Sequence, residues 1–214
     1  MKQKILLKSV EETAALASAF APLLSAGNTI LLNGAVGAGK TYFARELIST
    51  CLHDINALED IPSPTFTLVQ TYELKNVDIW HADLYRLSSL SEIYELGLDT
   101  AFDTAVCLLE WPNRLGEMLP KNALTLNFDI TEEDFREISL CWKDVMWDTI
   151  VKTCGFFVYG RVARRACRGA LRFNCLTAPN QPGRGIGHHR GFGCATFRPC
   201  PRHWIDLPPR LDPD

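Results

Sequence analysis

The sequence lacks any long apolar segment. No run approaches the roughly 18 consecutive apolar residues of a membrane-spanning helix, and the first residues lack the apolar core of a signal peptide. We therefore expect a cytoplasmic protein that does not bind a membrane. Apolar residues make up 47% of the 214 residues and charged residues 22%, as in an ordinary globular protein.

Several signature patterns are also missing. The sequence has no C-x-x-C pair, no N-K-x-D motif with which GTPases read guanine, and no internal repeat. Eight cysteines are present, but disulfides are not expected in the cytoplasm. Cys51, Cys107 and Cys141 lie in apolar or helical segments, where we expect them to pack as small hydrophobic residues.

Positive charge is scarce in the first two thirds of the chain. Residues 1–148 carry 11 basic and 22 acidic side chains, whereas residues 149–214 carry 11 basic and 3 acidic ones. The second part also holds 8 of the 14 glycines and 7 of the 12 prolines. This change of composition predicts a domain at 1–147 and a C-terminal extension at 148–214 that is poorly ordered or aberrant.

Two alternatives remain open for this extension. Its arginines and glycines could bind RNA through phosphate contacts. Its cysteines and histidines could form a zinc site, although they lack the usual ligand spacing. The residues concerned are Cys154, Cys167, Cys175, Cys194, Cys200, His188, His189 and His203.

The sequence does contain a complete phosphate-binding loop. Residues 34–41 follow the pattern G-x-x-x-x-G-K-[ST], after an apolar run at 29–32 and before a predicted helix at 42–48. Without bulky side chains, the loop amides can surround a phosphate at the positive end of the helix. Lys40 would reach the β- and γ-phosphates, and the Thr41 hydroxyl would bind Mg²⁺. The loop residues predicted to contact the nucleotide are Gly34, Gly37, Ala38, Gly39, Lys40, Thr41 and Tyr42.

Acidic residues follow two predicted strands. Glu110 comes directly after the apolar run at 106–109, and Asp83 ends the run at 79–82. Strands in a parallel sheet deliver such acids to one edge, where they can hold Mg²⁺ or orient a water molecule. Thr65, in the segment S-P-T-F-T, is a residue type suited to a nucleotide-sensing switch.

The remaining pattern indicates an α/β protein with a mainly parallel sheet, helices on both faces and two closing antiparallel strands. Ser9 and Glu12 form a capping box before a predicted helix that extends through Leu24. A further short helix should cover residues 90–96 and stop at Gly97. The predicted strands cover residues 4–8, 29–32, 66–72, 77–83, 105–109, 122–130, 136–142 and 155–159.

Together these segments resemble the TsaE family of P-loop ATPases. The similarity lies in the phosphate-binding loop, S-P-T-F-T-L-V at 63–69, H-A-D-L-Y-R-L at 81–87, E-L-G at 95–97 and L-E-W-P at 109–112. The resemblance implies a compact P-loop fold that binds ATP and slowly hydrolyses it with Mg²⁺. It further implies that the chain works with the TsaB and TsaD proteins, which attach threonylcarbamoyl to adenosine 37 of tRNAs reading ANN codons. Its contact with tRNA would be indirect.

The resemblance also assigns roles to single residues. Lys40 and Thr41 match the phosphate and Mg²⁺ positions, Glu110 an Mg²⁺-associated acid, and Asp83 a catalytic acid that we also expect near the metal. Thr65 matches the switch threonine. Trp111 matches the tryptophan beside the acid, Val10 a position near the base, and Arg136 an arginine near the nucleotide. Arg136 could equally be a surface arginine, and His81 could be either catalytic or packed in a strand.

Two positions depart from the family. Ala35 stands where an aspartate is common and Tyr42 where a threonine is common. Backbone amides form the loop, so Ala35 should preserve phosphate binding. A small-molecule kinase is the alternative function, but kinases usually close an arginine-bearing lid. The arginines before the extension, Arg45, Arg86, Arg114 and Arg136, include no lid-like pair.

Overall fold

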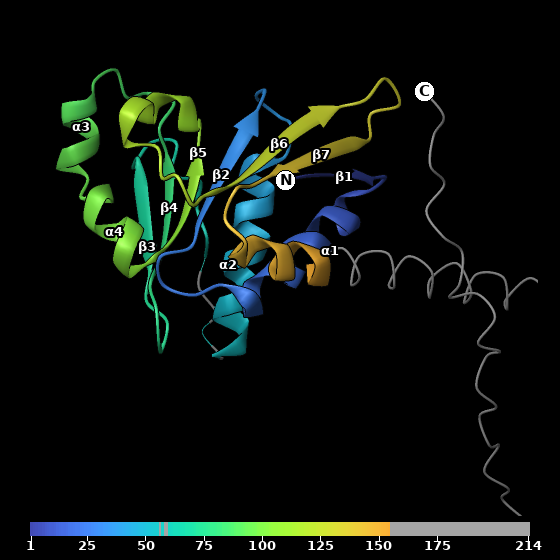
Figure 1. Cartoon of the computed structure of the whole chain (residues 1–214), viewed down its shortest axis with the longest axis horizontal. Coiled ribbons are helices and arrows are strands. Elements are labelled where there is room, and N and C mark those ends of the chain that lie inside the picture. Colours follow the sequence, from blue (N-terminus) through green and yellow to red (C-terminus); the bar gives the residue numbers. More distant parts are fainter. Residues whose placement is uncertain (56, 58–59, 155–214) are drawn as a thin grey trace, which may run out of the picture. The chain divides into compact units, whose positions relative to one another are not determined.

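The computed structural model describes residues 1–55, 57 and 60–154. They form a seven-stranded sheet in the order β1-β7-β6-β2-β5-β4-β3, shown in Figure 1. The strands are β1 (Lys2–Leu7), β2 (Thr29–Gly34), β3 (Val69–Tyr72), β4 (Ile79–Asp83), β5 (Val106–Glu110), β6 (Leu124–Ile130) and β7 (Arg136–Cys141). The helices are α1 (Val10–Phe20), α2 (Lys40–Asp54), α3 (Leu90–Glu95) and α4 (Leu98–Thr104), with 3₁₀ helices η1 (Ala21–Leu23) and η2 (Pro112–Met118).

The four central strands are parallel. β2 lies between β6 and β5, and β4 follows on the far side of β5, all in the same direction. Antiparallel strands extend the sheet on both sides, with β3 beside β4, and β7 and β1 beyond β6. Every residue of β5 is buried, as expected for a strand covered on both faces. The α/β prediction is confirmed, with the parallel pairing confined to the centre.

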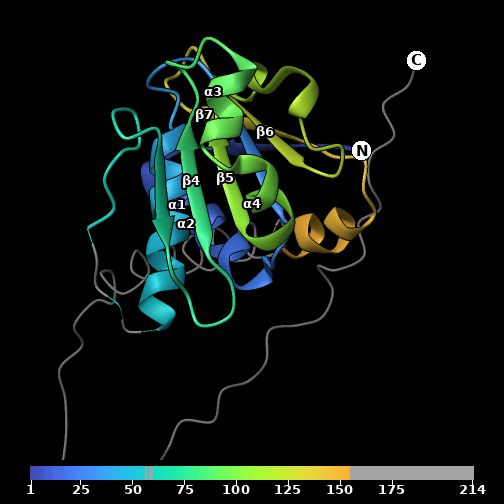
Figure 2. The same ribbon diagram turned by 90° about the vertical axis from the view of Figure 1, so that its left-hand side faces the viewer.

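Helices cover both faces of the sheet, as Figures 1 and 2 show. On one face, α1 and α2 bury an apolar cluster in which the rings of Phe20, Phe43 and Phe128 meet edge to face, with centroids 6.1 and 5.8 Å apart. On the other, α3, α4 and η2 cover a second cluster that includes Leu98 and Leu115. Helix α4 was not predicted from the sequence.

Several predicted boundaries differ from the structure, and two of these differences have a clear physical cause. The helix expected to reach Leu24 ends at Phe20 and continues as the 3₁₀ turn η1, because Pro22 cannot donate the next α-helical hydrogen bond. The strand expected from Phe66 begins at Val69. The residue before it, Leu68, has a left-handed backbone with φ of 68°, which breaks the extended run.

The packed region continues past residue 147. Residues 146–154 are helical, and the side chains of Trp147, Val151 and Cys154 are buried in the cluster under α1 and α2. The seven residues after the predicted boundary thus belong to the folded body. The predicted strand at 155–159, and the RNA-binding and zinc alternatives for the extension, concern residues outside the described part. The division into two domains stays a prediction.

The described cysteines are free thiols. Cys107 and Cys154 are buried, and Cys51 and Cys141 are half-buried. Burial raises the pKa of Cys107 and Cys154 to about 12 and that of Cys51 to about 11. Raised values are typical of inert structural thiols, in agreement with the packing role expected from the sequence. In the described part of the chain no helix has both the length and the apolar character to span a bilayer.

Candidate functional site

The phosphate-binding loop connects β2 to α2. Gly37 and Gly39 have φ of 78° and 108°, which residues with a side chain rarely adopt, and Gly39 is the N-cap of α2. A Cβ on Gly34 would lie 2.5 Å from the carbonyl oxygen of Phe128 on β6, so this position also requires glycine. Helix α2 begins at Lys40, two residues earlier than predicted, and its N-terminus faces the loop. The structure therefore forms the anion-binding geometry expected from the motif.

Lys40 is held inside this loop. Its side-chain amine donates to the carbonyl oxygens of Gly34 and Ala35, at 2.9 and 2.8 Å. The same amine lies 4.4 Å from the centroid of the Trp111 ring, a cation–π contact. Burial lowers the pKa of Lys40, and the negative charges of Glu110 and Asp83 oppose that shift. No carboxylate among the described residues lies within salt-bridge distance of this amine, and an anion bound in the loop would supply that partner.

Glu110 lies at the end of β5 and joins two other predicted residues. Its Oε2 accepts a hydrogen bond from the Thr41 hydroxyl at 2.9 Å, and its Oε1 lies 3.1 Å from Nε2 of His81. Glu110 and His81 are buried. The hydroxyl and the carboxylate that the sequence assigns to Mg²⁺ are thus in direct contact.

Asp83 forms a second linked pair with Thr65. The Thr65 hydroxyl donates to Oδ2 of Asp83 at 2.9 Å, and the backbone N–H of Tyr85 donates to Oδ1 at 3.0 Å. Thr65 also contacts the Ser63 hydroxyl at 2.9 Å. The predicted switch threonine and the predicted catalytic acid therefore meet, although they are 18 residues apart.

The strand register brings these acids to one edge of the sheet. Glu110 pairs with Leu32 on one side and with Asp83 on the other, so the last residues of β5 and β4 lie level with the C-terminal half of β2. Beyond β5 the backbone turns at Trp111, which has a left-handed φ of 58°. The Trp111 ring then packs against Tyr85, with centroids 4.9 Å apart. Parallel pairing thus brings both acids to one edge of the sheet, next to the end of β2 from which the phosphate-binding loop begins.

A groove of about 430 Å³ adjoins the loop. Three residues predicted to contact the nucleotide, Val10, Tyr42 and Arg136, line it together with Gly37 and Gly39. The Arg136 guanidinium donates to the backbone carbonyl and side-chain carboxylate of Asp134, at 2.7 and 3.0 Å. The other lining residues, not predicted from the sequence, are Leu7, Lys8, Ser9, Thr13 and Asp134. Their positions depend on β1 and β7 lying side by side, which no local motif indicates.

Comparison with known proteins identifies the family of this chain. Residues 7–138 match the family described as "Threonylcarbamoyl adenosine biosynthesis protein TsaE". The chain belongs to the TsaE family. It is similar to the TsaE protein of Rickettsia bellii, with 41% identity over 136 residues that cover 64% of this chain and 92% of the relative. It is also similar to TsaE of Bacillus subtilis, with 35% identity over 130 residues that cover 60% of this chain and 78% of the relative.

A solved structure supports the same fold. The crystal structure of Bacillus subtilis YdiB superposes with a TM-score of 0.57 at 24% sequence identity, covering 72% of this chain and 95% of that chain. At this identity the likeness shows the fold alone. The TsaE membership suggested by the sequence segments is therefore confirmed by the family match and the sequence relatives.

The TsaE-type site offers few protein ligands for a metal ion. Among the described residues, no group of three or more His, Cys, Asp or Glu side chains is arranged to hold one. Mg²⁺ commonly binds through one or two protein groups, with nucleotide phosphates and water completing its shell. Thr41 and Glu110, in contact beside the loop, fit that kind of site. Asp83 is at the same edge, as the partner of Glu110 in the strand register.

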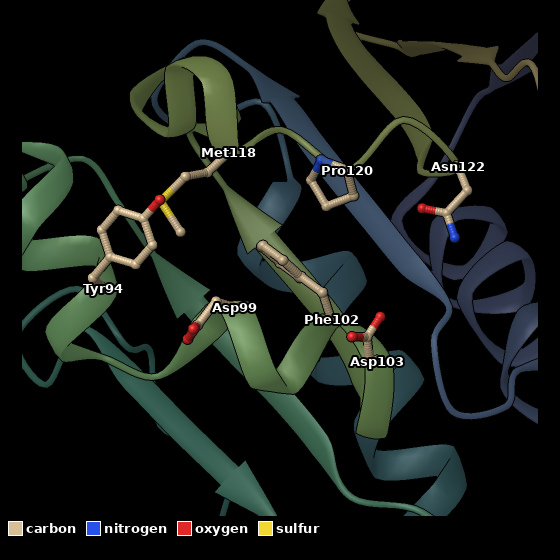
Figure 3. Close-up of a pocket in the computed structure, with 7 residues that line it drawn as sticks. All are labelled: Tyr94, Asp99, Phe102, Asp103, Met118, Pro120 and Asn122. Atoms are coloured by element: carbon tan, nitrogen blue, oxygen red, sulfur yellow. The ribbon is translucent and has the colours of Figure 1, made fainter.

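A second pocket, of about 360 Å³, contains none of the predicted site residues. Figure 3 shows that it lies between α3, α4 and the segment entering β6. Asp99 and Asp103 contribute its acidic groups, and Phe102 and Met118 its apolar ones. Its complete lining is Tyr94, Asp99, Phe102, Asp103, Met118, Pro120 and Asn122.

Proposed function

We propose that this chain is an Mg²⁺-dependent ATPase that supports threonylcarbamoyladenosine synthesis at position 37 of tRNAs reading ANN codons. The observation that carries the proposal is the meeting of Lys40, Thr41, Glu110 and Asp83 at the edge where the phosphate-binding loop opens. Membership of the TsaE family supports the pathway. Since that pathway acts on tRNA, we place the activity in the cytoplasm.

The geometry suggests how the triphosphate would be bound. The loop amides and the N-terminus of α2 would face the phosphates, and Lys40 would exchange its bonds to Gly34 and Ala35 for phosphate oxygens. Val10, Tyr42 and Arg136 would contact the nucleoside in the adjoining groove. Ala35 leaves this binding mode intact, because backbone groups form the loop.

Thr41 and Glu110 would hold Mg²⁺, which when bound neutralises charge on the phosphates. Asp83 is the acid best placed to orient the attacking water, since it ends β4 next to Glu110. On nucleotide binding, Thr65 would exchange its hydrogen bond to Asp83 for a contact with the nucleotide. This exchange gives Thr65 a switching role.

The partners are part of the same proposal. We assign the TsaB and TsaD proteins as partners that stimulate ATP turnover, with tRNA contacted only through them. The small-molecule kinase is less well supported. A kinase needs cationic side chains over the transferring phosphate, and the arginine that lines the groove, Arg136, is bonded to Asp134.

The test is ATP hydrolysis by the full chain, with and without TsaB and TsaD. Lys40→Ala should abolish nucleotide binding, whereas Glu110→Ala should retain ATP binding but lose Mg²⁺-dependent turnover. Lys121→Ala is the matched control, because Lys121 is an exposed lysine before β6, at the opposite end of the parallel strands. Unchanged turnover in the Lys40 and Glu110 variants would refute the site assignment. Failure of TsaB and TsaD to alter the rate would refute the partnership alone.

A further inference from the structure

His81 is a buried polar residue that the proposed hydrolysis does not use directly. It lies in the middle of β4 with 0% of its surface exposed, two residues before Asp83. Its Nε2 contacts Oε1 of Glu110, and Glu110 is itself only 2% exposed. A buried imidazole therefore contacts a carboxylate directly beneath the phosphate-binding loop.

The two ring nitrogens have different surroundings. An ionised carboxylate can only accept hydrogen bonds, so Nε2 must carry the hydrogen and donate it to Oε1. Nδ1 is buried and has no hydrogen-bond partner among the described residues. A hydrogen on Nδ1 would thus be a buried donor without an acceptor, an unfavourable arrangement. The contacts favour the imidazole tautomer with its single hydrogen on Nε2.

The hydrogen bonds to Glu110 come from two directions. His81 on the neighbouring strand donates to Oε1, and Thr41 on α2 donates to Oε2. With Oε1 held by a buried donor, rotation of the carboxylate would break a hydrogen bond inside the protein, where an unpaired polar group is costly. Oε2 is consequently kept beside the Thr41 hydroxyl.

We propose that His81 is a positioning residue, which fixes Glu110 so that Mg²⁺ meets a preformed pair of Oε2 and the Thr41 hydroxyl. The inference rests on the proposed function, since it concerns the same Mg²⁺ site. The imidazole suits this task because its ring is buried within β4 and directs Nε2 at Oε1 of Glu110. Partners of this kind typically change metal affinity or activity by about 10- to 100-fold.

The first test measures how strongly Mg²⁺ improves binding of a non-hydrolysable ATP analogue. Isothermal titration of the full chain, with Mg²⁺ and with EDTA, gives two dissociation constants whose ratio is the Mg²⁺ effect. In His81→Leu this ratio should fall by about 10- to 100-fold. His81→Gln keeps an N–H donor near the Nε2 position, so in this variant the ratio should return most of the way to the wild-type value.

Ile79→Ala is the matched control, because Ile79 is equally buried two residues earlier on the same face of β4. It should lower the melting temperature and leave the Mg²⁺ ratio unchanged. If His81→Leu kept the wild-type ratio, or if Ile79→Ala lowered it as much, His81 would be a packing residue and the inference would be wrong.

A second test needs no substitution. The ¹⁵N chemical shifts of the His81 ring in the nucleotide-free wild type should show one tautomer, with hydrogen on Nε2. Hydrogen on Nδ1, or exchange between the two forms, would overturn the inference even if the variants failed to fold. If the wild type showed no Mg²⁺ effect at all, the proposed function would fail, whereas the ring shifts would still report on the His81–Glu110 bond.

Discussion

Trp147 should be essential for the stability of the folded body, although it lies at the limit where the sequence predicts the domain to end. Its side chain is 0% exposed, and its indole N–H donates to the backbone carbonyl of Asn122. Val151 and Cys154 extend the same buried contact. We predict that Trp147→Ala strongly destabilises the full chain.

The expected magnitude follows from burial. Replacing a fully buried tryptophan by alanine typically costs about 3–5 kcal/mol, through lost apolar contact and the cavity that remains. Small domains have total stabilities of about 5–15 kcal/mol, so the variant should lose a large share. With a urea dependence of about 2 kcal/mol per molar, the unfolding midpoint should fall by about 1.5–2.5 M.

Urea unfolding followed by far-UV circular dichroism checks this expectation. Val145→Ala is the control, because Val145 is 72% exposed two residues earlier. A surface change of this kind should stay within about 0.5 kcal/mol of wild type. If Trp147→Ala also stayed within that range, the reasoning that residues 146–154 complete the core would be refuted. Nucleotide affinity should be unchanged in both variants, because Asn122 precedes β6 at the end of the sheet away from the loop.

Three further predictions concern the site and the buried thiols. Gly34→Ala should weaken nucleotide binding and lower the melting temperature, because its Cβ would meet the Phe128 backbone at 2.5 Å; wild-type values for both would contradict the close approach. Thr65→Val removes the hydroxyl that contacts Asp83 and would exchange this contact for one with the nucleotide. This variant should lower kcat by about 10- to 100-fold in steady-state assays, the loss expected for one hydrogen bond to a charged group, with KM little changed. An unaltered kcat would remove Thr65 from the mechanism. Burial raises the pKa of Cys107 and Cys154 to about 12, above the ordinary value near 9. The thiols therefore ionise at lower pH in the unfolded chain than in the folded one. The free energy of unfolding should hold at pH 7–8 and decline between pH 9 and 12. A urea midpoint that stayed constant up to pH 11 would contradict this sign.

The part of the site carried by continuous segments could be predicted from the sequence. The loop at 34–41 has one workable context, between a strand and a helix, and the structure has that context. Glu110 and Asp83 each follow an apolar run, and parallel pairing of those runs brings both acids to one edge. The apolar runs, and the rule that parallel strands end at one edge of a sheet, were sufficient here. Each inference needed only a strand and the residue that follows it.

Contacts between distant segments could not be predicted in the same way. The Thr65–Asp83 and His81–Glu110 bonds depend on strand order and on which face each side chain occupies. Helix 146–154 was missed because its buried residues, Trp147, Val151 and Cys154, lie where the composition changes and the apolar periodicity is short. Only the packed structure shows that their spacing of three to four residues forms one buried face.

The pairing of β1 with β7 has a consequence for how the chain is made. β1 is the first strand to be synthesised, yet its hydrogen-bonding partner begins at Arg136, 129 residues after β1 ends at Leu7. At about 5–20 residues per second, ribosomes leave β1 without its partner for roughly 6–26 s. During that interval Ile5 and Leu7, both buried in the finished protein, are held by no neighbouring strand. β1 can therefore join the sheet only after β7 has been synthesised. A nascent chain stalled before residue 136 would leave β1, with its apolar side chains, accessible to chaperones that bind at the ribosome.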